Sequence, residues 1–82
     1  MERVDLDLAK RFKFLRKLLG LSQKGFADKL GVSQKAISQW ERGERAIPAV
    51  LLKVLREKLN LNIDWFLTGK GEPFTQIDGK RK

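Results

Sequence analysis

Two short helical patterns joined by a single glycine, in residues 22–43, constrain the fold of this chain more than any other feature. Ser22 can cap the first helix, whose apolar residues on one face are Phe26, Ala27 and Leu30. Gly31 then supplies the positive φ that a sharp turn requires. The sequence therefore predicts two short helices connected by a tight turn.

The second helix of this pair has one apolar and one polar face. Ser33 can cap it, and at about 100° per residue an apolar arc contains Ala36, Ile37 and Trp40. The opposite arc carries side chains that form hydrogen bonds: Gln34, Lys35, Ser38, Gln39 and Arg42. Such a pair of helices, the second with an exposed polar face, is typical of a helix-turn-helix.

The length and charge of the chain limit its partners. With 82 residues the chain makes one small domain, which gains stability from a partner subunit. There are 18 Lys and Arg against 10 Asp and Glu, a formal net charge of +8, and this excess favours a polyanion such as nucleic acid. The alternative is that the charge only aids solubility.

Missing residue types exclude several functions. The chain has no cysteine and no histidine, which removes disulfides, zinc fingers, thiol nucleophiles and the commonest general base at neutral pH. Carboxylates are not clustered either, so we expect no enzyme activity, no metal and no other cofactor. No apolar run approaches the ~20 residues that span a bilayer, and the N-terminal MERVDLDLAK lacks the apolar stretch of a signal peptide. We expect a cytoplasmic, nucleoid-associated protein.

A further helix is predicted before the motif. Asp5 or Asp7 can cap it, Gly20 ends it, and its apolar stripe consists of Leu8, Phe12, Leu15 and Leu19. Basic residues alternate with this stripe, so the helix could instead lie on a membrane surface. We favour the reading in which the stripe closes the core.

Two more helices are predicted after the motif. Pro48 suits the first turn of one, Asn60 ends it, and its apolar face consists of Leu51, Leu52, Val54, Leu55 and Leu59. Asn62 can cap the last helix, IDWFLT, which Gly69 ends. The fold class is thus all-α with five helices, in a domain of residues 1–74 followed by a flexible basic tail at 75–82.

Two sequence signatures stand in register with these helices. They are GLSQ..FA..LGVSQ..IS.WERG, which covers the motif, and N.DW.LTG.GEP, which covers residues 62–73. The stretch from Leu15 to Pro73 that contains them resembles the phage-repressor type of helix-turn-helix domain, the lambda repressor and Cro (XRE) family. The resemblance implies a compact five-helix domain and a sequence-specific, double-stranded DNA-binding transcriptional regulator. It also implies a repressor that binds a palindromic operator as a homodimer.

The resemblance places the third helix in the major groove. By position, the base contacts would come from Gln34, Lys35, Ser38 and Gln39. A glutamine amide can pair with adenine N6 and N7, and lysine can donate to guanine O6 and N7. The alternative is that these are ordinary solvated helix residues.

Phosphate contacts are implied for five residues around the motif: Gln23, Lys24, Ser33, Arg42 and Arg45. Ala46 and Ile47 stand where many family members are basic, so this loop depends on Arg45 and backbone amides. Gly25 stands where a capping-box glutamate is expected. It either weakens its helix or allows close approach to a phosphate backbone.

Two further sets of residues follow from the resemblance. Family members pair an arginine of the first helix with a glutamate of the third, which implies a structural ion pair between Arg16 and Glu41; a solvated Glu41 is the alternative. The fifth helix and the segment after it form the family's two-fold contact, which here implies an interface of Ile63, Trp65, Phe66, Leu67 and Phe74.

Other functions remain open on the sequence. The same fold serves in antitoxins and bridging adaptors, so a toxin or another protein is an alternative partner. A third possibility is a nonspecific RNA-binding or nucleoid-coating protein that binds through charge alone.

Overall fold

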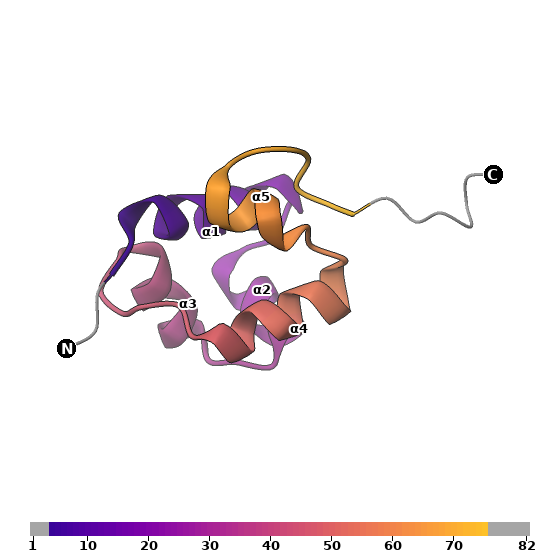
Figure 1. The fold of residues 1–82 in the computed structure, drawn as a ribbon. Helices are drawn as coiled ribbons and strands as arrows, with labels where there is room; N and C mark the ends of the chain where they lie inside the picture. Colours follow the sequence, from indigo (N-terminus) through magenta and orange to yellow (C-terminus); the bar gives the residue numbers. More distant parts are fainter. Residues whose placement is uncertain (1–3, 76–82) are drawn as a thin grey trace.

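The fold consists of five helices, which the computed structural model describes within residues 4–75 (Figure 1). In chain order they are α1 (Leu6–Leu18), α2 (Gln23–Leu30), α3 (Gln34–Glu41), α4 (Ala49–Leu59) and α5 (Ile63–Thr68). The predicted all-α class with five helices is therefore confirmed. The predicted tail lies outside the described residues from residue 76 onward.

Side-chain caps begin four of these helices. The capping residues are Asp5, Ser22, Ser33 and Asn62, each of which accepts a backbone N–H from the first turn. For the first helix the cap is Asp5, while Asp7 lies within the first turn. These caps explain why the short helices α2 and α3 begin where they do.

The start of α4 differs from the prediction. Pro48 is the N-cap residue, with φ −73° and ψ 150°, and the helix begins one residue later at Ala49. Its extended ψ excludes it from the first turn, and its carbonyl accepts the N–H of Leu51 at 3.0 Å. A proline fits this position as well as the next one, because neither needs a backbone N–H.

Two glycines make the turns that place α3. Gly31 has φ 76°, and an added Cβ would meet nothing within 4 Å, so the requirement there is purely conformational. Gly43, directly after α3, has φ 73°, and an added Cβ would lie 2.6 Å from Leu6 Cδ2. Gly43 therefore also allows the turn after α3 to pack against the start of α1.

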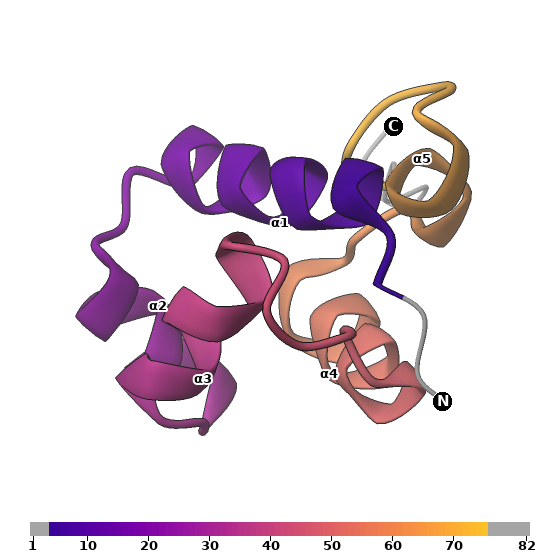
Figure 2. The same cartoon turned by 90° about the vertical axis from the view of Figure 1, so that its left-hand side faces the viewer.

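The core forms where α1 lies over the helix-turn-helix pair. Figure 2 shows α1 running across α2, α3 and α4, with α5 beside its N-terminal half. Phe12 of α1 is fully buried, and its ring centroid lies 5.2 Å from that of Phe26 and 5.9 Å from that of Trp40. Leu8, Phe12, Leu15 and Leu19 all belong to or pack against this core. The stripe that the membrane alternative needed is thus used inside the molecule.

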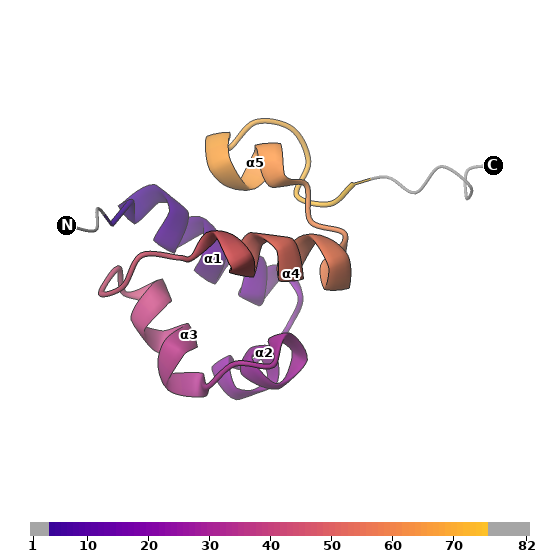
Figure 3. The same cartoon turned by 60° about the horizontal axis from the view of Figure 1, so that its bottom comes forward.

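The α5 helix lies on one side of α1 and α4, and α2 and α3 lie on the other side (Figure 3). Arg11 of α1 donates from Nε to the carbonyl of Phe66 at 2.7 Å and from Nη2 to that of Leu67 at 3.4 Å. The last carbonyls of a helix have no intrahelical partner, so this guanidinium caps the C-terminus of α5. No local pattern in the sequence indicates this role for Arg11.

A short backbone pairing closes the segment around α5. The N–H of Asn62 donates to the carbonyl of Pro73 at 2.8 Å, and the N–H of Thr75 donates to that of Asn60 at 2.8 Å. Between them Leu61 and Phe74 form an isolated antiparallel bridge. The chain after α5 is therefore held against the end of α4 at least as far as Thr75.

Candidate nucleic-acid interface

The α3 helix presents its polar face to solvent. Ile37 and Trp40 are buried beneath it. Gln34 and Lys35 in its first turn are exposed, and Ser38 and Gln39 are partly exposed. Side chains three and four positions apart share a helical face, so the predicted base-contact residues gather on the side away from the core. The same subunit leaves Gln34 and Lys35 uncovered.

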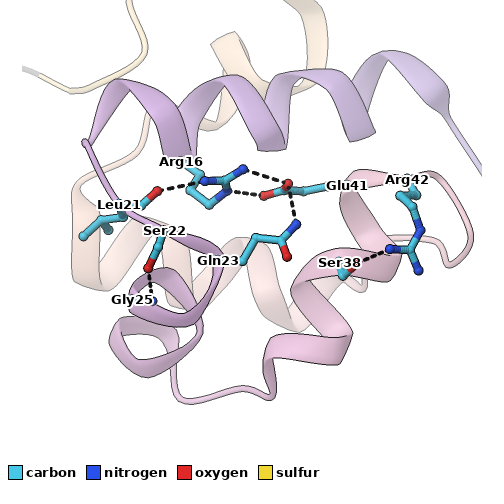
Figure 4. Close-up of polar contacts among 8 residues, drawn as sticks. All are labelled: Arg16, Leu21, Ser22, Gln23, Gly25, Ser38, Glu41 and Arg42. Carbon is cyan, nitrogen blue, oxygen red and sulfur yellow. Dashed lines mark hydrogen bonds and ion pairs between the residues drawn. The ribbon is translucent and has the colours of Figure 1, made fainter.

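A buried ion pair holds α3 against α1 (Figure 4). Arg16 Nε donates to Glu41 Oε2 at 2.6 Å, and Arg16 Nη2 donates to Glu41 Oε1 at 3.2 Å. The side chains are only 11% and 2% exposed. Arg16 Nη1 also donates to the carbonyl of Leu21 at 2.8 Å, so the guanidinium spans three segments. The pair that the sequence implied is present, and its bidentate geometry fixes the last turn of α3.

Gln23 completes this buried cluster. Its Nε2 donates to Glu41 Oε1 at 3.2 Å, so α1, α2 and α3 meet at one carboxylate (Figure 4). The resemblance implies that the Gln23 amide contacts a phosphate. The structure places one amide hydrogen on Glu41, which leaves the second hydrogen and the amide oxygen available. A phosphate contact by Gln23 would thus be oriented by Glu41.

A second arginine–glutamate pair lies on the surface at the end of α3. Arg42 Nε donates to Glu44 Oε2 at 2.8 Å, and Arg42 Nη2 donates to Glu44 Oε1 at 2.9 Å. Arg42 Nη1 also donates to the hydroxyl of Ser38 (Figure 4). The hydrogen bonds and charge of Glu44 raise the pKa of Arg42, and the hydrogen bonds from Arg42 lower the pKa of Glu44. Arg42, a predicted phosphate contact, is thus bonded both to Ser38, a predicted base contact, and to the carboxylate of Glu44.

The remaining predicted contacts lie around this face. Arg45 is exposed and its Nη1 donates to Gln39 Oε1 at 3.4 Å, which brings the loop after α3 beside the polar face. Lys24 is exposed and pairs with Asp28 on the same helix at 3.4 Å. Ser33 is exposed, but its hydroxyl accepts the N–H of Ala36 as the cap of α3. A phosphate contact by Ser33 would therefore use its hydroxyl hydrogen or its backbone N–H.

Gly25 has a local packing role. Its N–H donates to the Ser22 hydroxyl at 2.9 Å (Figure 4), and an added Cβ would lie 3.3 Å from that oxygen. A side chain at this position would crowd the cap of α2. Avoiding this crowding is a reason for glycine at position 25, in addition to a close approach to a phosphate backbone.

The expected dimer residues divide into exposed and buried groups. Leu67 is 46% exposed, and Ile63 and Phe74 are partly buried against the core. Phe66 is fully buried and Trp65 is 7% exposed, so these two implied interface residues pack inside the subunit and offer little surface to a partner. Their rings are needed to close the core between α1 and α5. The helical period of so short a segment does not show which side faces inward.

One exposed aromatic on α1 was missed. Phe14 is 51% exposed, and its ring centroid lies 6.0 Å from that of Trp65. The signal in the sequence was a phenylalanine placed off the apolar stripe, between basic residues of the first helix. Phe14 thus lies beside α5 with about half of its surface open to solvent.

The described part of the chain offers little for other classes of site. Within residues 4–75 no group of three or more potential metal-ligating side chains comes together. In the same residues no helix has both the length and the apolar character needed to cross a membrane.

Comparison with known proteins places the chain in a family. A family model described as helix-turn-helix matches residues 12–66. Repressor protein CI of Enterobacteria phage phi80 is 30% identical over 72 residues, which cover 88% of this chain and 30% of that protein. The transcriptional regulator DicA of Escherichia coli K12 is 33% identical over 69 residues, which cover 84% of this chain and 51% of DicA. The chain thus spans about half the length of these relatives or less.

A shorter relative and a solved structure extend the match. The uncharacterised regulator YazB of Bacillus subtilis is 36% identical over 55 residues, which cover 80% of its length. The crystal structure of the P22 c2 repressor in complex with a synthetic operator matches 77% of this chain and 96% of that chain. That match has a TM-score of 0.66 and 35% sequence identity. The architecture and the motif are therefore shared along almost the whole of the P22 domain.

Proposed function

Because this chain belongs to the helix-turn-helix family, we propose that it is a sequence-specific transcriptional regulator that binds double-stranded DNA through α3. The P22 c2 neighbour, which was crystallised with an operator, and the phage CI relative support this function. The proposed mode of action is repression, in which the bound domain occludes its operator.

One observation supports the proposal most directly. The polar face of α3 is exposed to solvent, while the helix is held in place by two sets of contacts. Ile37 and Trp40 hold it through the core, and Glu41 holds its last turn to Arg16. A recognition helix must present its side chains at a fixed angle, because a bidentate contact to a base edge tolerates little misplacement. The rigid mounting of α3 supplies that angle.

The proposed contacts divide by chemistry. Gln34 and Lys35, at the N-terminus of α3, read base edges, with Ser38 and Gln39 beside them. The phosphate contacts come from Gln23, Lys24, Ser33, Arg42 and Arg45, which position the domain without reading sequence. The net charge of +8 strengthens binding to any duplex.

We propose that the domain binds as a homodimer on an approximate palindrome. Leu67 is an exposed apolar side chain of α5, Ile63 lies four residues before it on the same helix, and Phe14 of α1 is a second exposed apolar side chain. Two α3 helices about 34 Å apart would then enter successive major grooves on one side of the duplex. The Leu67→Asp variant should dissociate the dimer in sedimentation experiments and weaken operator binding, while a wild-type protein that stays monomeric on its operator contradicts this part of the proposal.

Selection of bound fragments from a random duplex pool tests the function directly. We expect an enriched half-site repeated with a centre-to-centre spacing of about 10 base pairs. The selected duplex should bind about 10³-fold or more tightly than a random duplex at the same salt concentration. Equal affinity for selected and random duplexes would show that the protein binds DNA nonspecifically and would contradict the proposal of a sequence-specific regulator.

Two kinds of variant separate the proposed contacts. Gln34→Ala and Lys35→Ala should each reduce discrimination at one base pair by about 1–3 kcal/mol, while Arg45→Ala should weaken all duplexes alike. Lys53→Ala, which removes an exposed charge from α4, is the matched control and should change discrimination little. Unaltered discrimination in both α3 variants would show that other residues read the bases.

A further inference from the structure

The segment that we propose faces DNA, residues 33–47, contains two acids with opposite environments. Glu41 is buried and bonded to Arg16, so its charge is neutralised inside the fold. Glu44 is half exposed and bonded to Arg42, a proposed phosphate contact. A carboxylate on a DNA-facing surface repels the phosphate backbone, so the position of Glu44 calls for a physical reason.

The geometry of the Arg42–Glu44 pair supplies that reason. The Nε and Nη2 atoms of Arg42 donate to the two carboxylate oxygens at 2.8 and 2.9 Å. A guanidinium binds the oxygens of a phosphate with the same two parallel hydrogen bonds. Its remaining nitrogen, Nη1, donates to Ser38. In the free protein Glu44 thus occupies the edge of Arg42 that a phosphate would take.

We propose that Glu44 competes with DNA phosphate for Arg42 and thereby lowers the affinity of the domain for every duplex. This inference rests on the proposed DNA-binding function. Binding exchanges the carboxylate for a phosphate on the same edge of the guanidinium. Because phosphate carries no sequence information, the cost falls equally on specific and random DNA. A strongly basic domain therefore depends more on its base contacts for stable binding.

The exchange is available because both partners are accessible. Their side chains are 57% and 51% exposed, so Arg42 can rotate from the carboxylate toward a ligand without opening the core. The hydrogen bonds from Arg42 hold the pKa of Glu44 below its ordinary value, so the carboxylate is charged at neutral pH. The charged competitor is thus present at neutral pH.

The Glu44→Gln variant tests the proposal by fluorescence anisotropy with a selected duplex and a random duplex of equal length. Glutamine keeps the size of the side chain and removes its charge. We expect the affinity for both duplexes to rise by the same factor, about two- to five-fold per subunit. Glu57→Gln, an equal change of charge at an exposed position of α4, is the matched control and should have a smaller effect.

A double-mutant cycle with Arg42→Gln separates competition from simple charge repulsion. In the Arg42→Gln background the gain from Glu44→Gln should shrink to that of the Glu57→Gln control. An equal gain in both backgrounds means that Glu44 acts only through its charge and overturns the proposal. A loss of affinity in Glu44→Gln means that Glu44 orients Arg42 for DNA and also overturns it.

Different results would contradict the proposed function and the inference about Glu44. If the wild-type protein shows no selective binding to any duplex, the proposed function fails and this inference fails with it. If the wild-type protein binds selectively and Glu44→Gln is unchanged, only the inference fails. Circular dichroism melting curves of each variant verify that all comparisons are made between folded proteins.

Discussion

Two arginine–glutamate pairs lie at the end of α3, and their surroundings give the same chemistry opposite uses. Arg16 and Glu41 are nearly buried, span two helices and share their contacts with Gln23 and the carbonyl of Leu21. Arg42 and Glu44 are more than half exposed and lie two residues apart in one turn. Both pairs are bidentate, so geometry alone does not distinguish them.

The difference lies in what replaces a lost partner. Water can solvate either member of the exposed pair, so its two groups can separate and meet a ligand. No water reaches the buried carboxylate readily, so removing Arg16 strands a charge. The buried pair therefore fixes the angle of α3, and the exposed pair can exchange its partner for a phosphate.

The largest expected effect comes from Arg16→Leu. This variant leaves the Glu41 carboxylate buried without its cation, and we expect the free energy of unfolding to fall by about 3–5 kcal/mol. Urea denaturation followed by circular dichroism measures this loss. The double variant Arg16→Leu/Glu41→Leu should recover most of it, because no charge is then stranded. A loss below about 1 kcal/mol in the single variant would show that the Arg16–Glu41 pair contributes no more than an exposed ion pair.

A smaller effect is expected from Gln23→Ala. Glu41 keeps its arginine but loses one hydrogen bond, so the free energy of unfolding should fall by about 1 kcal/mol. Gln23→Glu should cost more, because it places a second carboxylate beside Glu41. The same denaturation measurements compare the two variants. A Gln23→Ala variant as stable as the wild type would indicate that the 3.2 Å contact contributes nothing.

The Arg42→Gln variant should change the denaturation midpoint only slightly, because the pair is exposed, while it weakens DNA binding. The lost contact is a proposed phosphate contact, so we expect the affinities for selected and random duplexes to fall together. The slope of log affinity against log salt should become less negative by about 0.9 per subunit. Anisotropy titrations at several salt concentrations measure this slope. A large loss of stability would place Arg42 among the structural residues instead.

The smallest effect concerns pH. The folded pKa of Glu44 lies below its unfolded value, so the pair stabilises the fold above the ordinary titration range of glutamate. This contribution is lost as the pH falls through the folded pKa. Carboxyl-carbon NMR titration should detect the lowered pKa of Glu44. In Arg42→Gln the pKa should return toward its ordinary value, and no change between the two proteins would show that the pair does not persist in solution.

Local signals in the sequence were sufficient where one residue decides the outcome. Ser22 and Ser33 cap α2 and α3 as predicted, and Gly31 and Asn60 take the positive φ that ends a helix. Each of these positions needs a particular side chain or backbone freedom that few residues supply. The signal is therefore contained in the immediate neighbours.

Predictions that depended on orientation were less successful. The resemblance implies Trp65 and Phe66 as interface residues, but the packing of α5 on α1 turns both side chains inward. In the sequence Arg11 is one of several basic residues on the first helix. Only the position of α5 brings the carbonyls of Phe66 and Leu67 within hydrogen-bonding distance of it. Residues far apart in the chain decide such contacts, and no local period specifies them.

The order of caps, glycines and apolar stripes along this chain by itself determined five helices, the tight turn before α3 and the polar composition of its outer face. Tertiary structure alone decided which of two similar arginine–glutamate pairs is buried. It did so because α1 and α2 close over Glu41, whereas the turn at Gly43 carries Glu44 out to solvent. Burial depends on what the rest of the chain places nearby, so identical side chains acquire different roles.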